Sequence, residues 1–211
     1  MWSFSPSHPS AFARWKAMST RGEPALKGFV IQSLWEDLNA LLREGTLPRE
    51  TAELRLHASD LDLLDEKIEP GLWYPNETYV RYAQLLAEVA RVTDAESYWS
   101  ERGRKAVERL LAGPSTVQKM VAGAKSFGNE AGRALMRLPE LVLNYGEWSF
   151  ERMEPRHWVV CVRAAEALPD SLRFSFQGAG ERIAHLLSGS PSRVTSSRAR
   201  RDTVRFEGRP A

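Results

Sequence analysis

Two neighbouring stretches decide the fold: Trp148-Ser149-Phe150-Glu151-Arg152-Met153 and Trp158-Val159-Val160-Cys161-Val162-Arg163. In the first stretch apolar and polar side chains alternate, which is typical of a strand with one buried face. The second stretch is apolar at consecutive positions, so we expect both of its faces to be covered and the strand to lie centrally in a sheet. The short connection between the two stretches predicts an antiparallel hairpin.

A second hairpin is expected further along the chain. Residues 176–187 have helical spacing of apolar side chains, and residues 193–197 and 203–207 predict two more strands. Helical patterns fill the chain ahead of both hairpins. The sequence therefore predicts an α+β fold, in which an N-terminal helical part is followed by a helix–hairpin–helix–hairpin unit with a four-stranded antiparallel sheet.

The same patterns predict one domain behind a leader. Residues 1–10 combine serine and proline with no periodicity, residues 11–20 are compatible with a short helix, and Arg21-Gly22-Glu23-Pro24 interrupts the chain. Residues 1–24 are therefore predicted to be a flexible leader. Residues 25–208 then form a single α+β domain, with its helical part at 25–137 and its sheet part at 140–208. The acidic segment at residues 60–65 is interpreted as a solvated connection, because it lacks the glycine and terminal glutamate of a calcium loop.

Composition favours a soluble globular protein. The 211 residues are 43% hydrophobic and 27% charged, and the net charge of +2 is too small to argue for a polyanionic partner. A single cysteine excludes an internal disulfide. No apolar run approaches the roughly 20 residues of a membrane span. We therefore expect a cytoplasmic protein.

Short phrases are spread over most of the chain: Leu26-Lys27-Gly28-Phe29-Val30, Asp60-Leu61-Asp62, Trp73-Tyr74-Pro75 with Tyr79, Glu101-Arg102-Gly103-Arg104, Leu138-Pro139 with Asn144-Tyr145, and Gln177-Gly178-Ala179-Gly180. Together they resemble a paralogous family, expanded in myxobacteria, that has no assigned reaction. The C-terminal half also resembles vinyl-reductase-type and haem-NO-binding-like small-molecule domains, which share the helix–hairpin–helix–hairpin order. The resemblance implies this fold, and the many paralogues imply sensing and signalling.

No metal and no cofactor are predicted. The four histidines, at positions 8, 57, 157 and 185, are scattered and have no zinc-ligand spacing. No proximal histidine is recognised, which argues against haem. Cys161 is expected to be an inert, small hydrophobic side chain within a strand.

Aromatic side chains and two glycines are candidates for a ligand site or an interface. Tyrosine and tryptophan combine large apolar area with a polar tip, which suits a pocket or interface and equally suits a core around the bend at Pro75. Glycines within the predicted helix indicate close approach of that helix to a neighbour, or a surface for a partner. The candidates are Trp73, Tyr74, Tyr79, Tyr82, Trp99, Gly178 and Gly180.

A basic patch is predicted on the C-terminal hairpin, at Arg193, Arg198, Arg200, Arg201 and Arg205. Such a patch can bind phosphate or an acidic partner, and it equally suits a solvated turn. Nucleic-acid binding is not expected, because aromatic side chains do not alternate with the arginines.

The sequence thus favours a non-catalytic binding or regulatory module that recognises a small ligand, a protein partner or a second copy of itself. Two alternatives stay open. One is an enzyme that uses polar groups around the first hairpin, at Glu147, Glu151, His157 and Arg163. The other is phosphate or nucleic-acid binding through the arginine hairpin.

Overall fold

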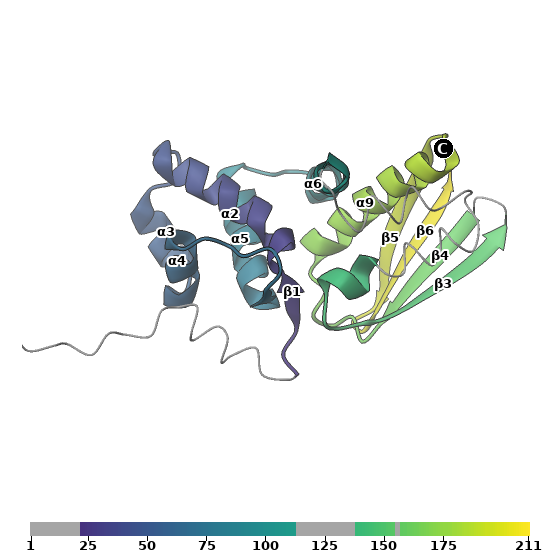
Figure 1. Cartoon of the computed structure of the whole chain (residues 1–211), viewed down its shortest axis with the longest axis horizontal. Coiled ribbons are helices and arrows are strands. Elements are labelled where there is room, and N and C mark those ends of the chain that lie inside the picture. The colour runs from purple at the N-terminus through teal and green to yellow at the C-terminus, as the bar shows by residue number, and fades with distance from the viewer. Residues whose placement is uncertain (1–21, 113–137, 155–156) are drawn as a thin grey trace, which may run out of the picture. The chain divides into compact units, whose positions relative to one another are not determined.

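The computed structural model in Figure 1 describes residues 22–112, 138–154 and 157–211. Most of the predicted leader lies outside these residues, as do residues 113–137 of the predicted helical part. The chain forms two compact units, Met1–Ala90 and Arg91–Ala211. The behaviour of residues 25–208 as a single domain stays a prediction.

The N-terminal unit contains four helices and a short two-stranded sheet within its described residues. The helices are α2 (Gly28–Arg43), α3 (Arg49–Arg55), α4 (Ala58–Asp65) and α5 (Asn76–Val89). The strands β1 (Ala25–Lys27) and β2 (Trp73–Pro75) pair antiparallel, with Leu26 opposite Tyr74. This small sheet was not predicted, because strands of three residues show no periodicity.

Helix α4 corrects the interpretation of residues 60–65. Asp60 is completely buried, and its carboxylate accepts hydrogen bonds from Arg81 Nε at 2.5 Å, from Arg81 Nη2 at 3.0 Å and from Thr78 Oγ1 at 2.8 Å. It also accepts the His57 backbone N–H at the start of the helix. The expectation of a solvated connection is therefore wrong for Asp60, whereas Asp62 and Asp65 are exposed. The Asp60 carboxylate tolerates burial because it is fully paired, and its partner Arg81 lies 21 residues away along the chain.

Among its described residues, the C-terminal unit contains the four-stranded sheet and two long helices. Its elements are α6 (Ala95–Ala112), β3 (Glu147–Glu154), β4 (His157–Arg163), α9 (Asp170–Ser188), β5 (Ser192–Arg200) and β6 (Thr203–Pro210), with a short helical stretch at residues 138–142. The strand order is β3-β4-β6-β5 and every pairing is antiparallel. The predicted α+β class, the antiparallel sheet and the central position of β4 are confirmed.

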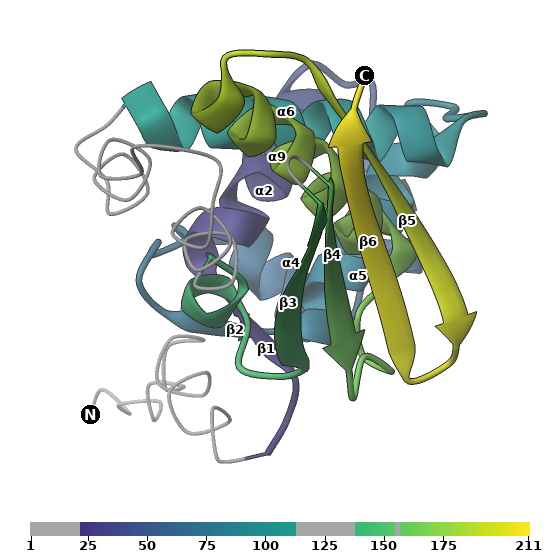
Figure 2. The same cartoon turned by 90° about the vertical axis from the view of Figure 1, so that its right-hand side faces the viewer.

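Helix α9 lies along one face of the sheet, and α6 packs against α9 (Figures 1 and 2). The two helices approach each other through glycines. A Cβ on Gly103 would lie 1.9 Å from the Ser175 carbonyl oxygen, and one on Gly178 would lie 1.8 Å from the Ser100 carbonyl oxygen. Because both obstacles are backbone atoms, no side chain can fit at either position.

Candidate functional site

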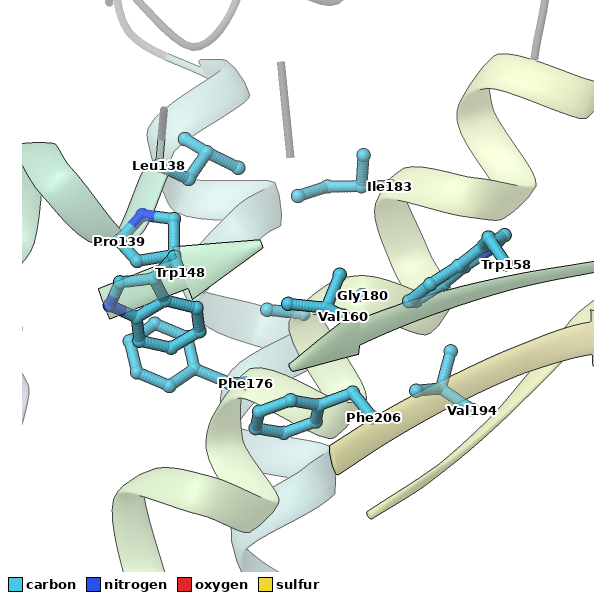
Figure 3. Close-up of a pocket in the computed structure, with 11 residues that line it drawn as sticks. Leu138, Pro139, Trp148, Trp158, Val160, Phe176, Gly180, Ile183, Val194 and Phe206 are labelled. Atoms are coloured by element: carbon cyan, nitrogen blue, oxygen red, sulfur yellow. The ribbon is translucent and has the colours of Figure 1, made fainter. Parts of the chain in front are cut away.

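An apolar cavity of about 60 Å³ lies between α9 and the sheet (Figure 3). Strands β3, β4 and β6 contribute Trp148, Val160 and Phe206 to its wall, and α9 contributes Phe176, Gly180 and Ile183. These side chains face inward because the two-residue alternation of the strands and the apolar stripe of the helix meet here.

Aromatic side chains in stacked and edge-on contact form part of the cavity wall. The Trp148 ring lies 5.5 Å from Phe176 at an interplanar angle of 75°, and 6.3 Å from Phe206 at 16°. The Trp148 indole N–H is buried and has no hydrogen-bond partner within the described residues. In Figure 3 this nitrogen lies on the side of the ring away from Val160. The wall is therefore almost wholly carbon, and it suits an apolar ligand.

The opposite flank of α9 carries polar side chains at four-residue spacing, which we call the α9 polar row: Arg173, Gln177 and Glu181. Arg173 Nη1 donates to the Ser196 carbonyl oxygen at 3.0 Å, and Ser196 Oγ donates to Gln177 Oε1 at 2.6 Å. Glu181 Oε1 accepts the Val194 N–H at 3.1 Å. The row thus ties the helix to the edge strand β5, and sequence reasoning missed it.

The predicted aromatic candidates are not gathered into one site. Trp73, Tyr74, Tyr79 and Tyr82 belong to the N-terminal unit, whereas Trp99 belongs to the C-terminal unit. All except the half-buried Trp73 are buried. Tyr82 Oη donates to the Asp60 carbonyl oxygen at 2.7 Å, and burial raises the pKa of this phenol well above its ordinary value. These buried positions agree with the alternative that the aromatic side chains form part of the core. A role in ligand binding or in an interface stays a prediction.

The two glycine candidates have different surroundings. Gly178 lies against the α6 backbone, as described above. Gly180 lines the apolar cavity, and a Cβ placed there would lie 3.6 Å from Trp158 Cη2 and 3.7 Å from Val194 Cγ2, which are ordinary contacts. Close approach therefore explains Gly178 but not Gly180.

Much of the predicted basic patch is committed to intramolecular contacts. Arg198 donates to the carbonyl oxygens of Ala165, Leu168 and Arg201, so it fixes the loop before α9. Arg200 and Arg205 lie 3.5 Å from Asp202 and 3.4 Å from Glu207 respectively. Binding of an acidic partner by the patch stays a prediction.

The polar groups considered for an enzyme are spread along the first hairpin. His157 Nε2 lies 2.8 Å from Glu207 Oε1 on β6, and Glu147 lies opposite Arg163 at the far end of the ladder. Arg209, followed by His157, holds the pKa of Glu207 below its ordinary range. The structure therefore ties His157 to Glu207 and not to the other three groups.

Comparison with known proteins identifies the fold but no family. No family model matches the chain, and no curated protein matches it. A mutant H-NOX protein from K. algicida, in its unliganded Fe(II) form, has a TM-score of 0.62 at 8% identity, covering 88% of this chain and 96% of that chain. A mutant H-NOX protein from T. tengcongensis gives 0.58 at 10% identity, covering 87% and 97%. A third structure, from work on haem distortion in the H-NOX family, gives 0.57 at 10% identity, covering 87% and 94%.

The chain therefore has an H-NOX-like fold, in agreement with the haem-NO-binding-like resemblance of its sequence. Membership of the myxobacterial family stays a prediction. The expectation of no cofactor is corrected, because solved structures of this fold are described as Fe(II) or haem proteins. The missing proximal histidine was a weaker guide than the fold. The sequence also contains a Tyr-x-Ser-x-Arg segment that sequence reasoning missed, Tyr98-Trp99-Ser100-Glu101-Arg102 in the first turns of α6.

The apolar cavity does not by itself fit a haem. Its volume of about 60 Å³ is far below the roughly 300 Å³ or more of pockets that enclose drug-sized ligands. No histidine, cysteine or tyrosine lies among its described lining residues, so it offers no axial ligand. A haem in this chain would need a site other than this cavity.

Within the described part of the chain, no group of three or more histidine, cysteine, aspartate or glutamate side chains could hold a metal ion. None of the helices in residues 22–112, 138–154 and 157–211 combines the length and the apolar character that crossing a membrane requires.

Proposed function

We propose that this chain is a ligand-binding regulatory module of H-NOX-like fold, and that its C-terminal unit takes up a small apolar molecule between α9 and the sheet. The observation that carries the proposal is the apolar cavity, whose wall is built from rings contributed by β3, β6 and α9. The fold supports it, because one protein that shares the fold is described as an oxygen-binding H-NOX domain.

The size of the cavity limits the ligand. A water molecule needs about 10–15 Å³ of such space, and an engineered apolar cavity of about 150 Å³ takes benzene or xenon. A space of about 60 Å³ lies between these limits. It therefore suits a molecule of a few atoms, such as a dissolved diatomic gas, and xenon is a convenient probe of the same class.

Xenon binding tests the proposal directly. Amide and methyl NMR spectra of the full chain under xenon pressure should show shifts at Val160, Ile183 and Phe206. In Gly180→Ala the added methyl group occupies part of the cavity without a clash, so xenon affinity should fall by roughly tenfold. Gly71→Ala is the matched control, because its Cβ would meet nothing within 4 Å. Unchanged xenon binding in Gly180→Ala would show that xenon does not bind in the apolar cavity.

Haem is the second ligand to test, because structures of this fold are described as haem proteins. Native mass spectrometry and the visible absorption spectrum of the chain, expressed with added haem, read its occupancy. One haem per chain would make haem the ligand of the regulatory module. A bare chain that also fails to bind xenon would refute ligand binding. The native mass spectrum also gives the number of chains in the complex. It therefore tests the predicted binding of a second copy or of a protein partner.

A further inference from the structure

The two edges of the four-stranded sheet are covered to different extents. Because the strand order is β3-β4-β6-β5, strands β3 and β5 form the edges (Figure 2). An edge strand presents backbone N–H and C=O groups that no neighbouring strand uses, and such a row can pair with a strand of another chain. The cover on each edge therefore decides where this sheet can be extended.

The β5 edge is closed by the α9 polar row. Glu181 Oε1 accepts the Val194 N–H at 3.1 Å, and Arg173 Nη1 donates to the Ser196 carbonyl oxygen at 3.0 Å. These two backbone groups lie in the first half of β5 and are already used inside the chain. A further strand could not pair there without breaking both hydrogen bonds, and it would leave buried side chains of α9 without partners.

The β3 edge is open in the described part of the chain. The β3 backbone forms the ladder with β4, and no described residue bonds to it from the other side. Residues 151–154 are exposed, with Met153 at 50%, and Trp148 and Phe150 are only half-buried. An open edge that carries apolar side chains is a surface on which a further strand can dock.

The sequence of β3 is complementary to itself in one antiparallel register. This register has Phe150 on a twofold axis perpendicular to the sheet, and it uses residues 148–152, where the ladder of β3 is regular. The directly opposed residues of the two copies would then be Phe150 with Phe150, Trp148 with Arg152, and Ser149 with Glu151. A ring would face a ring, a guanidinium would face an indole, and no like charges would meet.

The neighbouring registers are disfavoured by charge. With the axis at Glu151, this carboxylate would lie directly opposite its own copy. With the axis at Ser149, Glu147 would lie opposite Glu151 of the second copy on both sides of the axis. Like charges in direct cross-strand contact are destabilising, so the register centred on Phe150 is selected.

We infer that β3 is the surface through which two copies of this chain associate, by antiparallel pairing of their β3 strands centred on Phe150. The partner is a second copy because the match is a property of the strand's own sequence. The pairing would join the two sheets into one, with the closed β5 edges at its two ends. Since a twofold contact uses the same surface on both copies, the assembly stops at a dimer. The inference does not depend on ligand uptake by the apolar cavity.

Sedimentation equilibrium of the full chain tests the inference, and it should show a reversible equilibrium of monomer and dimer. In Ser149→Glu a new carboxylate would face Glu151 of the second copy at two symmetric positions, so the dissociation constant should rise by roughly tenfold. Ser149→Lys should lower it by a similar factor, and adding Glu151→Lys to Ser149→Glu should restore dimerisation. Ser197→Glu is the matched control, because Ser197 is an exposed serine in the same cross-strand row but on the β5 edge.

Three results would overturn the inference. A chain that stays monomeric at millimolar concentration would assign the open edge to a different partner. A dimer of equal affinity in Ser149→Glu and the parent chain would place the contact elsewhere, and equal weakening by Ser149→Glu and Ser149→Lys would exclude the register. Xenon binding measured on the same samples keeps the two proposals apart, because a monomer that takes up xenon would refute the dimer and leave the ligand site intact.

Discussion

The two flanks of α9 differ in chemistry, although residues that are adjacent in the sequence belong to different flanks. Phe176 and Gly180 line the apolar cavity of about 60 Å³, whereas their sequence neighbours Gln177 and Glu181 line a polar hollow of about 270 Å³. Successive helical residues are turned by about 100°, so adjacent side chains reach different neighbours. Helix α9 is therefore not a simple amphipathic helix with one solvent-exposed face. Both of its flanks are covered, one by aromatic rings and one by hydrogen-bonded polar groups.

The largest expected effect comes from the flank of α9 that touches α6. In Gly178→Ala the new Cβ would lie 1.8 Å from the Ser100 carbonyl oxygen, so the helices must separate. We expect the free energy of unfolding to fall by roughly 3 kcal/mol, the upper part of the range for overpacking. Chemical denaturation of both proteins measures the difference.

Gly180→Ala is the matched control for this variant. Its Cβ makes ordinary contacts only, and alanine is the better helix former by about 1 kcal/mol. The free energy of unfolding should therefore stay the same or rise by up to about 1 kcal/mol. If the two glycine variants had the same stability, the proposed difference between the flanks of α9 would be wrong.

A smaller loss is expected from the α9 polar row. Gln177→Leu keeps the volume but removes the hydrogen bonds to Glu96 and Ser196, leaving polar groups without partners at a buried position. We expect a cost of about 1–3 kcal/mol in the free energy of unfolding. Gln32→Leu removes a comparable exposed bond to Glu36 and should change stability by less than about 0.5 kcal/mol. A stable Gln177→Leu protein would show that the row contributes little.

Local patterns explain which parts of the fold the sequence could predict. The alternation at Trp148, Phe150, Val204 and Phe206 is visible within a few residues, and it yielded the four-stranded sheet. The burial of Asp60 could not be predicted, because it depends on Arg81 and Thr78, which lie 21 and 18 residues away. From the local sequence alone, a charged residue in such a segment is predicted to be solvated, because its ion-pair partner lies elsewhere in the chain.

The candidate sites were less predictable for the same reason. Inward-facing rings were expected, but the space that they leave depends on how helix and sheet side chains fill the interface. The spacing of Arg173, Gln177 and Glu181 was visible as an i, i+4, i+8 series, yet nothing in it showed that an edge strand would cover it. Glycine at both 178 and 180 indicated close packing, although only the structure separates the glycine that packs on α6 from the one beside the cavity.

The smallest effect concerns Asp94, at the start of α6 and on the rim of the polar hollow. The hydroxyl of Ser97, followed by its backbone N–H, holds the pKa of this carboxyl below its ordinary value of 3.8. A lowered pKa in the folded state means that the ionised carboxylate stabilises the fold above the ordinary pKa and that this contribution is lost as the pH falls through the folded pKa. We therefore expect Asp94→Asn to be slightly less stable than the parent chain at neutral pH.

The difference between the two proteins should be constant from pH 7 to about pH 5 and should shrink below the ordinary pKa. Denaturation midpoints at a series of pH values measure it, and Ser97→Ala should reproduce part of the effect. Xenon binding at the apolar cavity should not change between pH 7 and pH 5, because no titratable side chain is among its described lining residues. A stability difference that grows as the pH falls would contradict the assigned sign, since it would require Asp94 to be destabilised in its charged form.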